Sequence, residues 1–590
     1  MADLNKDKKF LRDLKENTKT VADHFRVASS LKPRIAEMPS DSKRRIAILS
    51  NFTTRGLPEC LLVKSFLRTM YIDVYEGAYG QWRQEVMGSD LYDFKPDVIF
   101  ILLDSFGIEH DLFHSHHAEG KSKISNALGE HFTELKNVIR MLKEKTDAKI
   151  VVGNVPIYWK SILGVADAKS DFSLKRAVMK ANVEFEEHYV NDQRVFVFDF
   201  DGWFGHIGKD KFWYDKFFFL ADMKIAPEAL PMLADELTSY LIPFFMRSKK
   251  CLVLDLDNTL WGGIIGEDGI EKIALAPYGK GQPFYLFQKL ILGLYQKGVI
   301  LAINSKNNEE DVTNVLKNHP HMLLKEHHFA SIKSNWHDKV SNLREIAKEL
   351  NIGIDSLVFI DDDEANRALV EELLPEVTVV DLPKDPSMYF RAILGLREFE
   401  NTGFTEEDLK RGESYNADRQ RRELQSNANM DLESFLKTIE LRVSVEELSE
   451  RTLARAAQLT QKTNQFNLTT RRYREEDIPG MLKRGARMWV AGVADKFGDY
   501  GITGFAIVAP REKGWEIDTF LLSCRVLGKK VEEHFLKKIL SELKEKSGEG
   551  TVTGFFIKSE KNTVAKDFYE KMGFKKRSSH EGTEEWVLNL

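Results

Sequence analysis

The segment from Lys250 to Thr259 restricts the fold of this 590-residue chain more than any other part of the sequence. The apolar run Cys251-Leu252-Val253-Leu254 comes directly before Asp255 and Asp257. A short continuous apolar run is typical of a strand buried inside a parallel sheet. Functional groups in such sheets gather at the carboxyl ends of the strands. We therefore expect a doubly wound α/β domain with both carboxylates at that edge.

Asp255 and Asp257 are two residues apart, so their side chains share a face in an extended segment. One carboxylate can then attack a phosphorus atom while the other acts as acid for the leaving group and later as base for water. This chemistry also needs a hard cation, a donor to the phosphoryl oxygens and a positive charge. We predict Asp255 as the nucleophile, Asp257 as the acid–base group and Thr259 as a further catalytic residue.

The donor and the positive charge follow in order along the chain. Ser305 comes after the apolar run Val299–Ile303 and can donate to a phosphoryl oxygen. Lys339 precedes the helix-like segment Val340–Leu350, which could hold its side chain toward the strand ends. We predict Ser305 and Lys339 as catalytic residues, with Lys333 as the competing cation.

A second acidic run ends the apolar segment Leu357–Ile360. Clustered carboxylates repel one another unless a cation is bound, so Mg²⁺ is the simplest explanation for the run. A solvated turn is the alternative, but four elements in the expected order argue against it. The predicted metal ligands are Asp255, Asp257, Asp361 and Asp362, with Asp362 as first choice among the later pair.

Asp255-x-Asp257-x-Thr259, Ser305, Lys339 and Asp361-Asp362 resemble the four motifs of the haloacid dehalogenase superfamily, which implies a magnesium-dependent phosphotransfer domain. Only 49 residues separate Asp255 from Ser305, and 33 separate Ser305 from Lys339. Both stretches are too short for a large inserted domain. We expect a minimal cap and an open site.

Length and hydrophobic patterning predict several domains, because 590 residues exceed what one core organises. Strand-sized apolar runs separated by helix-like segments predict a first parallel sheet before the phosphotransfer domain. The stretch from 391 to 426 is rich in charged and amide residues, as in a solvated helical linker. The expected division is a lead-in at 1–40, an α/β domain at 41–245, the phosphotransfer domain at 246–385, the linker at 386–435 and an α+β domain at 436–590.

The first domain resembles the SGNH-hydrolase type of α/β fold, a flavodoxin-like architecture, through Ser50-Asn51 after the run Ile46–Leu49. Its catalytic signature departs from the family pattern. Ile101-Leu102-Leu103-Asp104 replaces the expected Gly-x-Asn, no clear Asp-x-x-His falls between Asp210 and Asp222, and His206 is more simply a surface residue. We interpret this domain as a cap, docking or assembly module.

The third domain carries a glycine turn, Arg525-Val526-Leu527-Gly528-Lys529-Lys530, before a helix-like segment. Free N–H groups at a helix start suit a pyrophosphate. Together with the segment from Asn562 to Phe574, this turn resembles the GNAT-type N-acetyltransferase fold, which binds the pantetheine–pyrophosphate arm of coenzyme A. Lys530 departs from the family pattern, which has glycine or alanine there, and a fold kept without its cofactor is the alternative. The predicted cofactor-binding residues are Arg525, Gly528, Lys529, Lys530, Asn562 and Tyr569.

Two further segments of this domain are open to more than one interpretation. The segment from Thr463 to Thr469 suits a recognition loop or, more simply, an amide-rich turn. The segment from Asp495 to Gly501 is typical of a β-turn pair.

The chain has only three cysteines, Cys60, Cys251 and Cys524, which argues against a disulfide framework or a cysteine zinc site and favours a reducing cytoplasm. Cys524 lies beside Arg525 near a predicted helix start, where a thiolate would be stabilised. We predict Cys524 as a candidate nucleophile and keep Cys251 as the other candidate. Inert packing is the alternative for both.

Charge and hydropathy exclude two classes of partner. A net charge of −6 gives no general basis for nucleic-acid binding. The first 20 residues lack the apolar stretch of a secretory signal, and the longest apolar runs are strand-sized, so no membrane association is expected.

The domain order resembles that of the FkbH-like proteins, through the motif Leu254–Gly269, the loop from Thr463 to Leu468 and Ser523-Cys524-Arg525-Val526-Leu527-Gly528. The resemblance implies a glyceryl transferase and phosphatase that takes 1,3-bisphosphoglycerate, removes phosphate and loads a glyceryl unit onto an acyl carrier protein, in polyketide and related pathways. Mg²⁺ and the carrier's phosphopantetheine, or coenzyme A, are the implied cofactors. One rival is a phosphatase joined to an acetyl-CoA-dependent N-acetyltransferase of surface-polysaccharide synthesis. A non-catalytic carrier-docking scaffold is the other.

Overall fold

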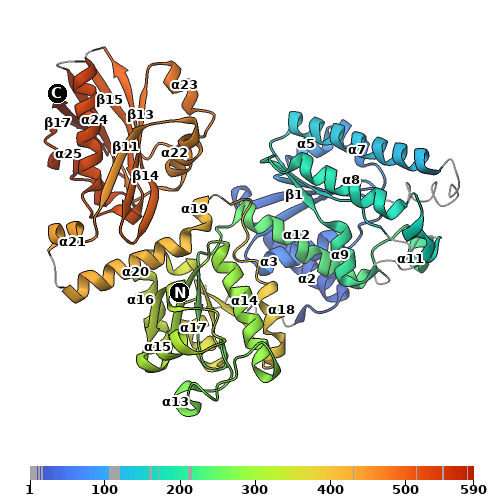
Figure 1. The fold of residues 1–590 in the computed structure, drawn as a ribbon. Helices are drawn as coiled ribbons and strands as arrows, with labels where there is room; N and C mark the ends of the chain where they lie inside the picture. Colours follow the sequence, from blue (N-terminus) through green and yellow to red (C-terminus); the bar gives the residue numbers. More distant parts are fainter. Residues whose placement is uncertain are drawn as a thin grey trace. The chain divides into compact units, whose positions relative to one another are not determined.

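The structure is a computed structural model that describes residues 10, 14, 17–104, 120–157, 163–171, 173–209, 215–404, 406–428, 431–512, 514–547, 550–580 and 582–590 (Figure 1). The chain divides into two compact units, Met1–Ser248 with Glu400–Thr402 and Lys249–Phe399 with Gly403–Leu590. Among the described residues, no helix is long and apolar enough to cross a bilayer.

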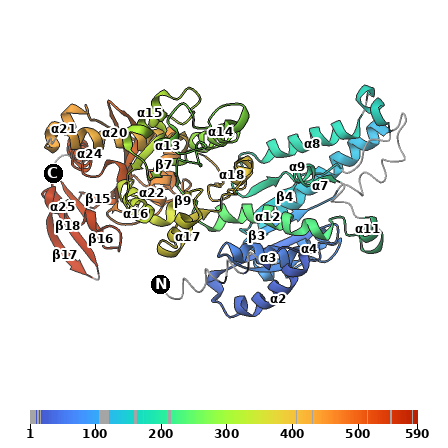
Figure 2. The ribbon, with the colours of Figure 1, turned by 90° about the horizontal axis from the view of Figure 1, so that it is seen from below.

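The first unit is built on a five-stranded parallel sheet with the order β2-β1-β3-β4-β5, an order typical of flavodoxin-like folds. Successive residues of a strand face opposite sides, so Ile46 and Ile48 enter one core and Ala47 and Leu49 the other. Figure 2 shows α7 and α8 on one side of the sheet and α2, α3 and α12 on the other. The strands are β1 (Lys43–Ser50), β2 (Tyr71–Glu76), β3 (Val98–Leu102), β4 (Lys149–Gly153) and β5 (Val195–Phe198). The helices are α2 (Val21–Ala36), α3 (Leu57–Leu67), α4 (Trp82–Met87), α5 (Asp90–Phe94), α7 (Gly120–Lys145), α8 (Leu174–Tyr189), α9 (Phe200–Ile207), α11 (Asp215–Ala221) and α12 (Leu230–Phe245).

The second unit begins with another five-stranded parallel sheet, of order β10-β9-β6-β7-β8. This is the doubly wound arrangement, with the first strand, β6, at the centre. Its strands are β6 (Cys251–Leu254), β7 (Ile300–Ser305), β8 (Phe329–Ser334), β9 (Leu357–Ile360) and β10 (Thr378–Val380). Its helices are α13 (Ile265–Asp268), α14 (Gln282–Gln296), α15 (Glu309–Asn318), α16 (Lys339–Glu349), α17 (Glu364–Leu373) and α18 (Tyr389–Leu394). Only α13, α14 and one 3₁₀ turn lie between β6 and β7, so no large domain is inserted there.

The rest of this unit carries a mixed sheet in the order β11-β13-β14-β15-β16-β18-β17, with β12 paired to β15. Only the pair β15–β16 is parallel. The strands are β11 (Arg442–Glu447), β12 (Phe466–Asn467), β13 (Arg487–Asp495), β14 (Gly498–Arg511), β15 (Gly514–Leu522), β16 (Thr551–Ile557), β17 (Lys575–His580) and β18 (Thr583–Asn589). The helices are α22 (Glu450–Lys462), α23 (Ile478–Lys483), α24 (Val531–Ser547) and α25 (Phe568–Lys571).

Three helices join the two sheets of the second unit: α19 (Glu406–Leu409), α20 (Arg411–Ala428) and α21 (Leu432–Thr438). The sequence predicted a solvated helical linker, but Arg419 and Arg421 of α20 are buried. Arg422 donates to the carbonyl of Ala330 on the edge strand β8 at 3.1 Å. Arg421 forms a bidentate pair with Asp495 of the mixed sheet, with both N···O distances 2.6 Å. The helix therefore covers the free edge of β8 and is anchored to both sheets.

Candidate active site

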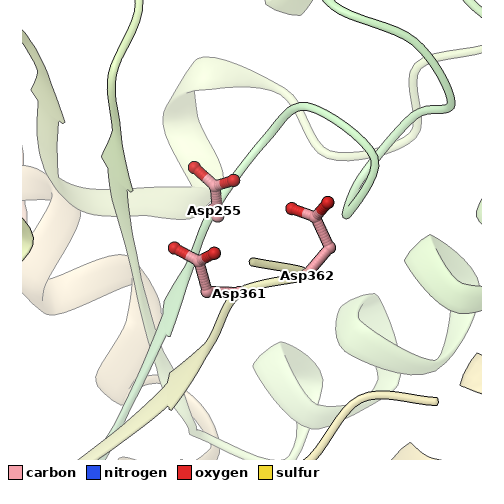
Figure 3. A group of neighbouring side chains, drawn as sticks. All are labelled: Asp255, Asp361 and Asp362. Carbon is pink, nitrogen blue, oxygen red and sulfur yellow. The ribbon is translucent and has the colours of Figure 1, made fainter. Parts of the chain in front are cut away.

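The catalytic carboxylates meet because β6 and β9 are neighbours in register. Leu254 pairs with Ile360, and the N–H of Asp255 donates to the Ile360 carbonyl at 2.9 Å. The next residues along the two strands, Asp255 and Asp361, therefore leave the same edge of the sheet side by side. Asp255, Asp361 and Asp362 each offer an oxygen within 4.8 Å of the others, and Figure 3 shows the three carboxylates gathered at the strand ends.

Lys339 is the cation that reaches these carboxylates. It is the first residue of α16, whose N-cap Asp338 accepts the N–H of Ser341 at 2.8 Å. Its Nζ lies 2.6 Å from Asp255 Oδ1 and 3.0 Å from Asp361 Oδ2, and only 2% of the residue is exposed. Burial alone would lower the pKa of Lys339, but Asp255 and Asp361 outweigh it and the net shift is upward. The lysine therefore stays charged.

Lys333, the competing candidate, lies on β8 and is directed elsewhere. Its Nζ is 3.4 Å from Glu345 and 3.2 Å from Glu349, both on α16. Of the two lysines that the sequence left open, only Lys339 contacts Asp255.

The charges of the site do not balance. Three carboxylates face one ammonium group, and burial, followed by the charge of Asp255, raises the pKa of Asp361. Burial, followed by the charges of Asp255 and Asp361, raises the pKa of Asp362 to about 6. Among the described residues, this is the one group of acidic, histidine or cysteine side chains able to hold a metal ion. An all-oxygen donor set with surplus negative charge fits Mg²⁺.

Asp257 was predicted as a fourth ligand, but its carboxylate lies outside this group. Oδ1 accepts the indole N–H of Trp261 at 2.9 Å and the backbone N–H of Ile265 at 3.0 Å. Oδ2 accepts the amide of Asn307 at 2.9 Å. Three donors therefore occupy this side chain, which explains why it does not join the other carboxylates.

The turn after Asp257 depends on Asn258, which has a left-handed backbone with φ of 52°. Asparagine tolerates this conformation better than most residues. Its side chain accepts the N–H of Gly263 at 2.9 Å, which closes the loop. Thr259 within this loop is fully buried, with its hydroxyl 3.5 Å from Asp362.

Ser305 ends β7 and is 1% exposed, so its hydroxyl lies inside the site. Asn307 donates to it at 3.1 Å as well as to Asp257. Asn307 was missed in the sequence, although its place two residues after Ser305 is a usable signal. Arg367 was also missed; it donates to the backbone carbonyls of Asp361 and Asp362 at 2.9 and 2.7 Å.

The glycine turn of the third domain is tied to the linker helices. Lys529 donates to the Tyr500 hydroxyl and, at 3.1 Å, to the Arg525 carbonyl. Burial lowers its pKa to about 8. Gly528 and Lys530 both have positive φ, 75° and 58°, and Lys530 forms a 2.9 Å ion pair with Glu433 of α21. Both lysines are therefore engaged within the protein.

Asn562 and Tyr569 are internal. The Asn562 amide donates to the carbonyls of Asn467 and Ile557 at 3.0 and 2.8 Å. Tyr569 is fully buried, and its ring stacks on Trp586 at 6.4 Å between centroids. Their cofactor-binding role thus stays a prediction that rests on the resemblance.

The strands β15 and β16 pair with each other only as far as Ile517 and Gly554. Beyond that pair, the loop from Thr463 to Thr469 lies between the two strands. Phe466 is buried in the core, and β12 pairs with Leu521 and Leu522. The N–H of Leu468 donates to the Phe520 carbonyl, and the Leu468 carbonyl accepts the N–H of Ile557. These contacts tie the segment into the sheet, which goes beyond the amide-rich turn that was the simpler interpretation. The segment Asp495–Gly501 is the β13–β14 turn, with Asp495 accepting the N–H of Phe497.

The structure does not bring a cysteine to the carboxylates. Cys524 is exposed and lines a pocket of about 160 Å³ with Glu349, Leu350 and residues of α20. Lys339 begins α16 and Leu350 follows its last residue, so roughly 16 Å of helix separates the two ends. Cys251 is fully buried, which raises the pKa of its thiol.

At the corresponding sheet edge of the first unit, Asn51 and Asp104 exchange two hydrogen bonds, of 2.7 and 2.8 Å. Asp104 also pairs with the buried Lys224. His206 is exposed on α9, as expected, and Asp210 lies outside the described residues. Ser50 is buried and accepts the N–H of Phe52.

A doubly wound sheet that gathers three carboxylates and one buried lysine at its carboxyl edge has groups that phosphotransfer needs and a place for a divalent cation. Residues 45–241 match the family described as FkbH, N-terminal domain, which confirms the predicted resemblance over that segment.

One solved structure shares most of its length with this chain: the N-terminal part of the protein BF1531 from Bacteroides fragilis, "containing phosphatase domain complexed with Mg". It is 29% identical, with a TM-score of 0.57, and the match covers 64% of this chain and 99% of that one. The match to a structure that contains a phosphatase domain agrees with the phosphotransfer domain that the sequence predicted.

Two acetyltransferase structures match a quarter of the chain. They are the ribosomal-protein-S18-alanine N-acetyltransferase from Escherichia coli, at 14% identity, and the PaiA N-acetyltransferase from Thermoplasma acidophilum in complex with coenzyme A, at 16%. The matches cover 93% and 99% of those chains, each with a TM-score of 0.20, which is too low to establish a shared fold. No curated protein matches the chain.

Proposed function

We propose that the second unit hydrolyses phosphate from a small acyl or alkyl phosphate through an aspartyl-phosphate on Asp255, with Mg²⁺ as cofactor. The observation that carries the proposal is the contact of buried Lys339 with Asp255, beside the carboxylates of Asp361 and Asp362. The relative from Bacteroides fragilis, which contains a phosphatase domain with Mg, supports the same reaction class.

Asp255, Asp361 and Asp362 would hold the metal. Bound Mg²⁺ supplies positive charge to the phosphoryl oxygens. Lys339 keeps Asp255 in place, and Ser305 offers a hydroxyl to a phosphoryl oxygen.

The reaction then takes two displacements. The Asp255 carboxylate attacks phosphorus, the bond to the leaving oxygen breaks, and Asp257 gives that oxygen a proton. Asp257 next takes a proton from water, whose oxygen attacks the same phosphorus. Inorganic phosphate leaves and free Asp255 is restored.

We further propose that the substrate is 1,3-bisphosphoglycerate or a related acyl phosphate, and that the acyl group passes to the phosphopantetheine thiol of an acyl carrier protein. The thiolate would attack the acyl carbon, the carbon–oxygen bond to the 1-phosphate would break, and inorganic phosphate and a 3-phosphoglyceryl thioester would form. Hydrolysis of the remaining 3-phosphate at Asp255, as above, would leave the glyceryl thioester. The match to the FkbH N-terminal domain supports this assignment. The GNAT-like third domain would receive the carrier's arm. The distance between the Cys524 pocket and Lys339 favours direct transfer to the carrier over a cysteine intermediate.

The test is to mix the protein, Mg²⁺, 1,3-bisphosphoglycerate and a phosphopantetheinylated carrier, and to weigh the carrier by mass spectrometry. A glyceryl mass shift is expected with the native chain, and phosphate release is expected to disappear in Asp255→Asn. Glu371→Gln removes an exposed carboxylate from the same domain and serves as control. Acetyl-CoA turnover without carrier would instead support the N-acetyltransferase alternative. Undiminished function of Asp255→Asn would support the docking scaffold.

A further inference from the structure

Asn307 holds a position in the site that the proposed reaction has not used. Its amide nitrogen lies 2.9 Å from Asp257 Oδ2 and 3.1 Å from Ser305 Oγ. The residue is 5% exposed. One buried amide thus contacts two groups of the site. One is the Asp257 carboxylate, which moves protons in the proposed reaction, and the other is the Ser305 hydroxyl, which would face the phosphoryl group.

The backbone around Asn307 is held from the neighbouring strand. The Ser334 hydroxyl donates to the Asn307 carbonyl at 3.0 Å, and the N–H of Asn335 donates to the Ser305 carbonyl at 3.1 Å. These bonds extend the pairing of β7 and β8 past the last residues of both strands. The amide therefore reaches Asp257 from a rigid support, as positioning groups require.

The other contacts of Asp257 show why this amide matters. Both remaining donors, the Trp261 indole and the Ile265 backbone, bind Oδ1 and belong to the same loop as Asp257. Among the described residues, Asn307 alone donates to Oδ2, and it alone comes from outside this loop, from the segment that follows β7. Without Asn307, the Asp257 carboxylate would be held only at Oδ1, by donors of the same loop that carries Asp257.

We propose that Asn307 is a positioning residue that orients Asp257 for proton transfer to the leaving group. The inference rests on the proposed phosphatase function of the same site. It predicts a dependence on the leaving group, because protonation matters most when the departing oxygen is strongly basic and little when it is weakly basic.

The test compares two phosphate substrates, p-nitrophenyl phosphate with a weakly basic leaving group and glycerol 3-phosphate with a strongly basic one. Because Asp257 also serves the later attack of water, which is common to both substrates, the step compared is release of the leaving group in a single turnover. Asn307→Ala is expected to lower the rate of this step by about 10- to 100-fold on glycerol 3-phosphate and only a few-fold on the aryl phosphate. KM for the two substrates is expected to change by less than kcat. Equal losses on both substrates, or no loss on either, would overturn the proposal.

Two further variants separate donation from packing. Asn307→Asp keeps the size of the side chain but removes its donor, so it is expected to behave no better than Asn307→Ala; recovery of native kcat by Asn307→Asp would contradict the proposal. Asn308→Ala removes the neighbouring exposed amide, which bonds to Asp311 and Trp336, and is expected to leave the rates on both substrates unchanged. If the native chain hydrolyses neither substrate, and Asp255→Asn changes nothing, the proposed function itself fails.

Discussion

Replacing Asp362 with asparagine is expected to stabilise the metal-free protein while weakening its response to Mg²⁺. The substitution keeps the size of the side chain and the oxygen that faces Thr259, but removes one of three neighbouring negative charges. Two unit charges 4.8 Å apart repel by about 3.5 kcal/mol at an effective dielectric constant of 20. The upward shift of the Asp362 pKa from 3.8 to about 6 corresponds to about 3 kcal/mol.

Asp362 is only partly buried, so solvent screening reduces this figure, and we expect a gain of about 1–2 kcal/mol in the free energy of unfolding. For a domain of this size, that raises Tm by about 2–8 °C. The sign depends on pH. A raised carboxyl pKa destabilises the folded state in full above about pH 6, and this cost fades as pH falls to the ordinary value of 3.8, below which both states are protonated.

The assay is thermal unfolding in EDTA at pH 7.5 and pH 4, and again with Mg²⁺ at pH 7.5. Asp362→Asn should melt higher than the native chain in EDTA at pH 7.5, should show no gain at pH 4, and should gain less from Mg²⁺. Glu371→Gln makes the same charge change at an exposed site and should stay within about 0.5 kcal/mol of native. A lower Tm for Asp362→Asn in EDTA at pH 7.5, or a native response to Mg²⁺, would refute the charge argument.

Three other substitutions test the site and its support. Asp255→Asn should reduce phosphate release at least about 1,000-fold while the variant still unfolds cooperatively, and residual turnover above a tenth would count against its role as nucleophile. Lys339→Met leaves two buried carboxylates without their cation and should lower the free energy of unfolding by about 3–5 kcal/mol, measured by urea denaturation in EDTA. The control Lys333→Met breaks a more exposed ion pair and should lower it by about 1 kcal/mol or less. Equal losses for the two variants would contradict the assignment. Arg421→Met strands the buried Asp495 and should cost about 3–5 kcal/mol, and the added Asp495→Asn change should recover part of it; strictly additive losses would show that the pair does not couple.

Sequence alone determined the chemical content of the site. A buried strand that ends in Asp255, with Ser305, Lys339 and Asp361 following at the ends of later elements, is readable because apolar runs mark strands and parallel strands end at one edge. The central strand and β9 lie where their apolar runs predicted. The edge strand Phe329–Ser334 was not predicted, because four of its six residues are polar or small and the pattern resembles a loop.

Only the tertiary structure decided which side chains meet. The sequence favoured Lys339 over Lys333 because Lys339 precedes a helix, but only the direction in which α16 leaves the sheet brings its ammonium group to Asp255. Asp257 lies apart from the other carboxylates, because Asn307 and two donors of its own loop hold it there. The helix expected to be solvated is anchored by a buried arginine, Arg421, whose partner Asp495 is 74 residues away in the chain. Contacts of that kind are set by three-dimensional packing, and no local pattern of charge or hydropathy specifies them.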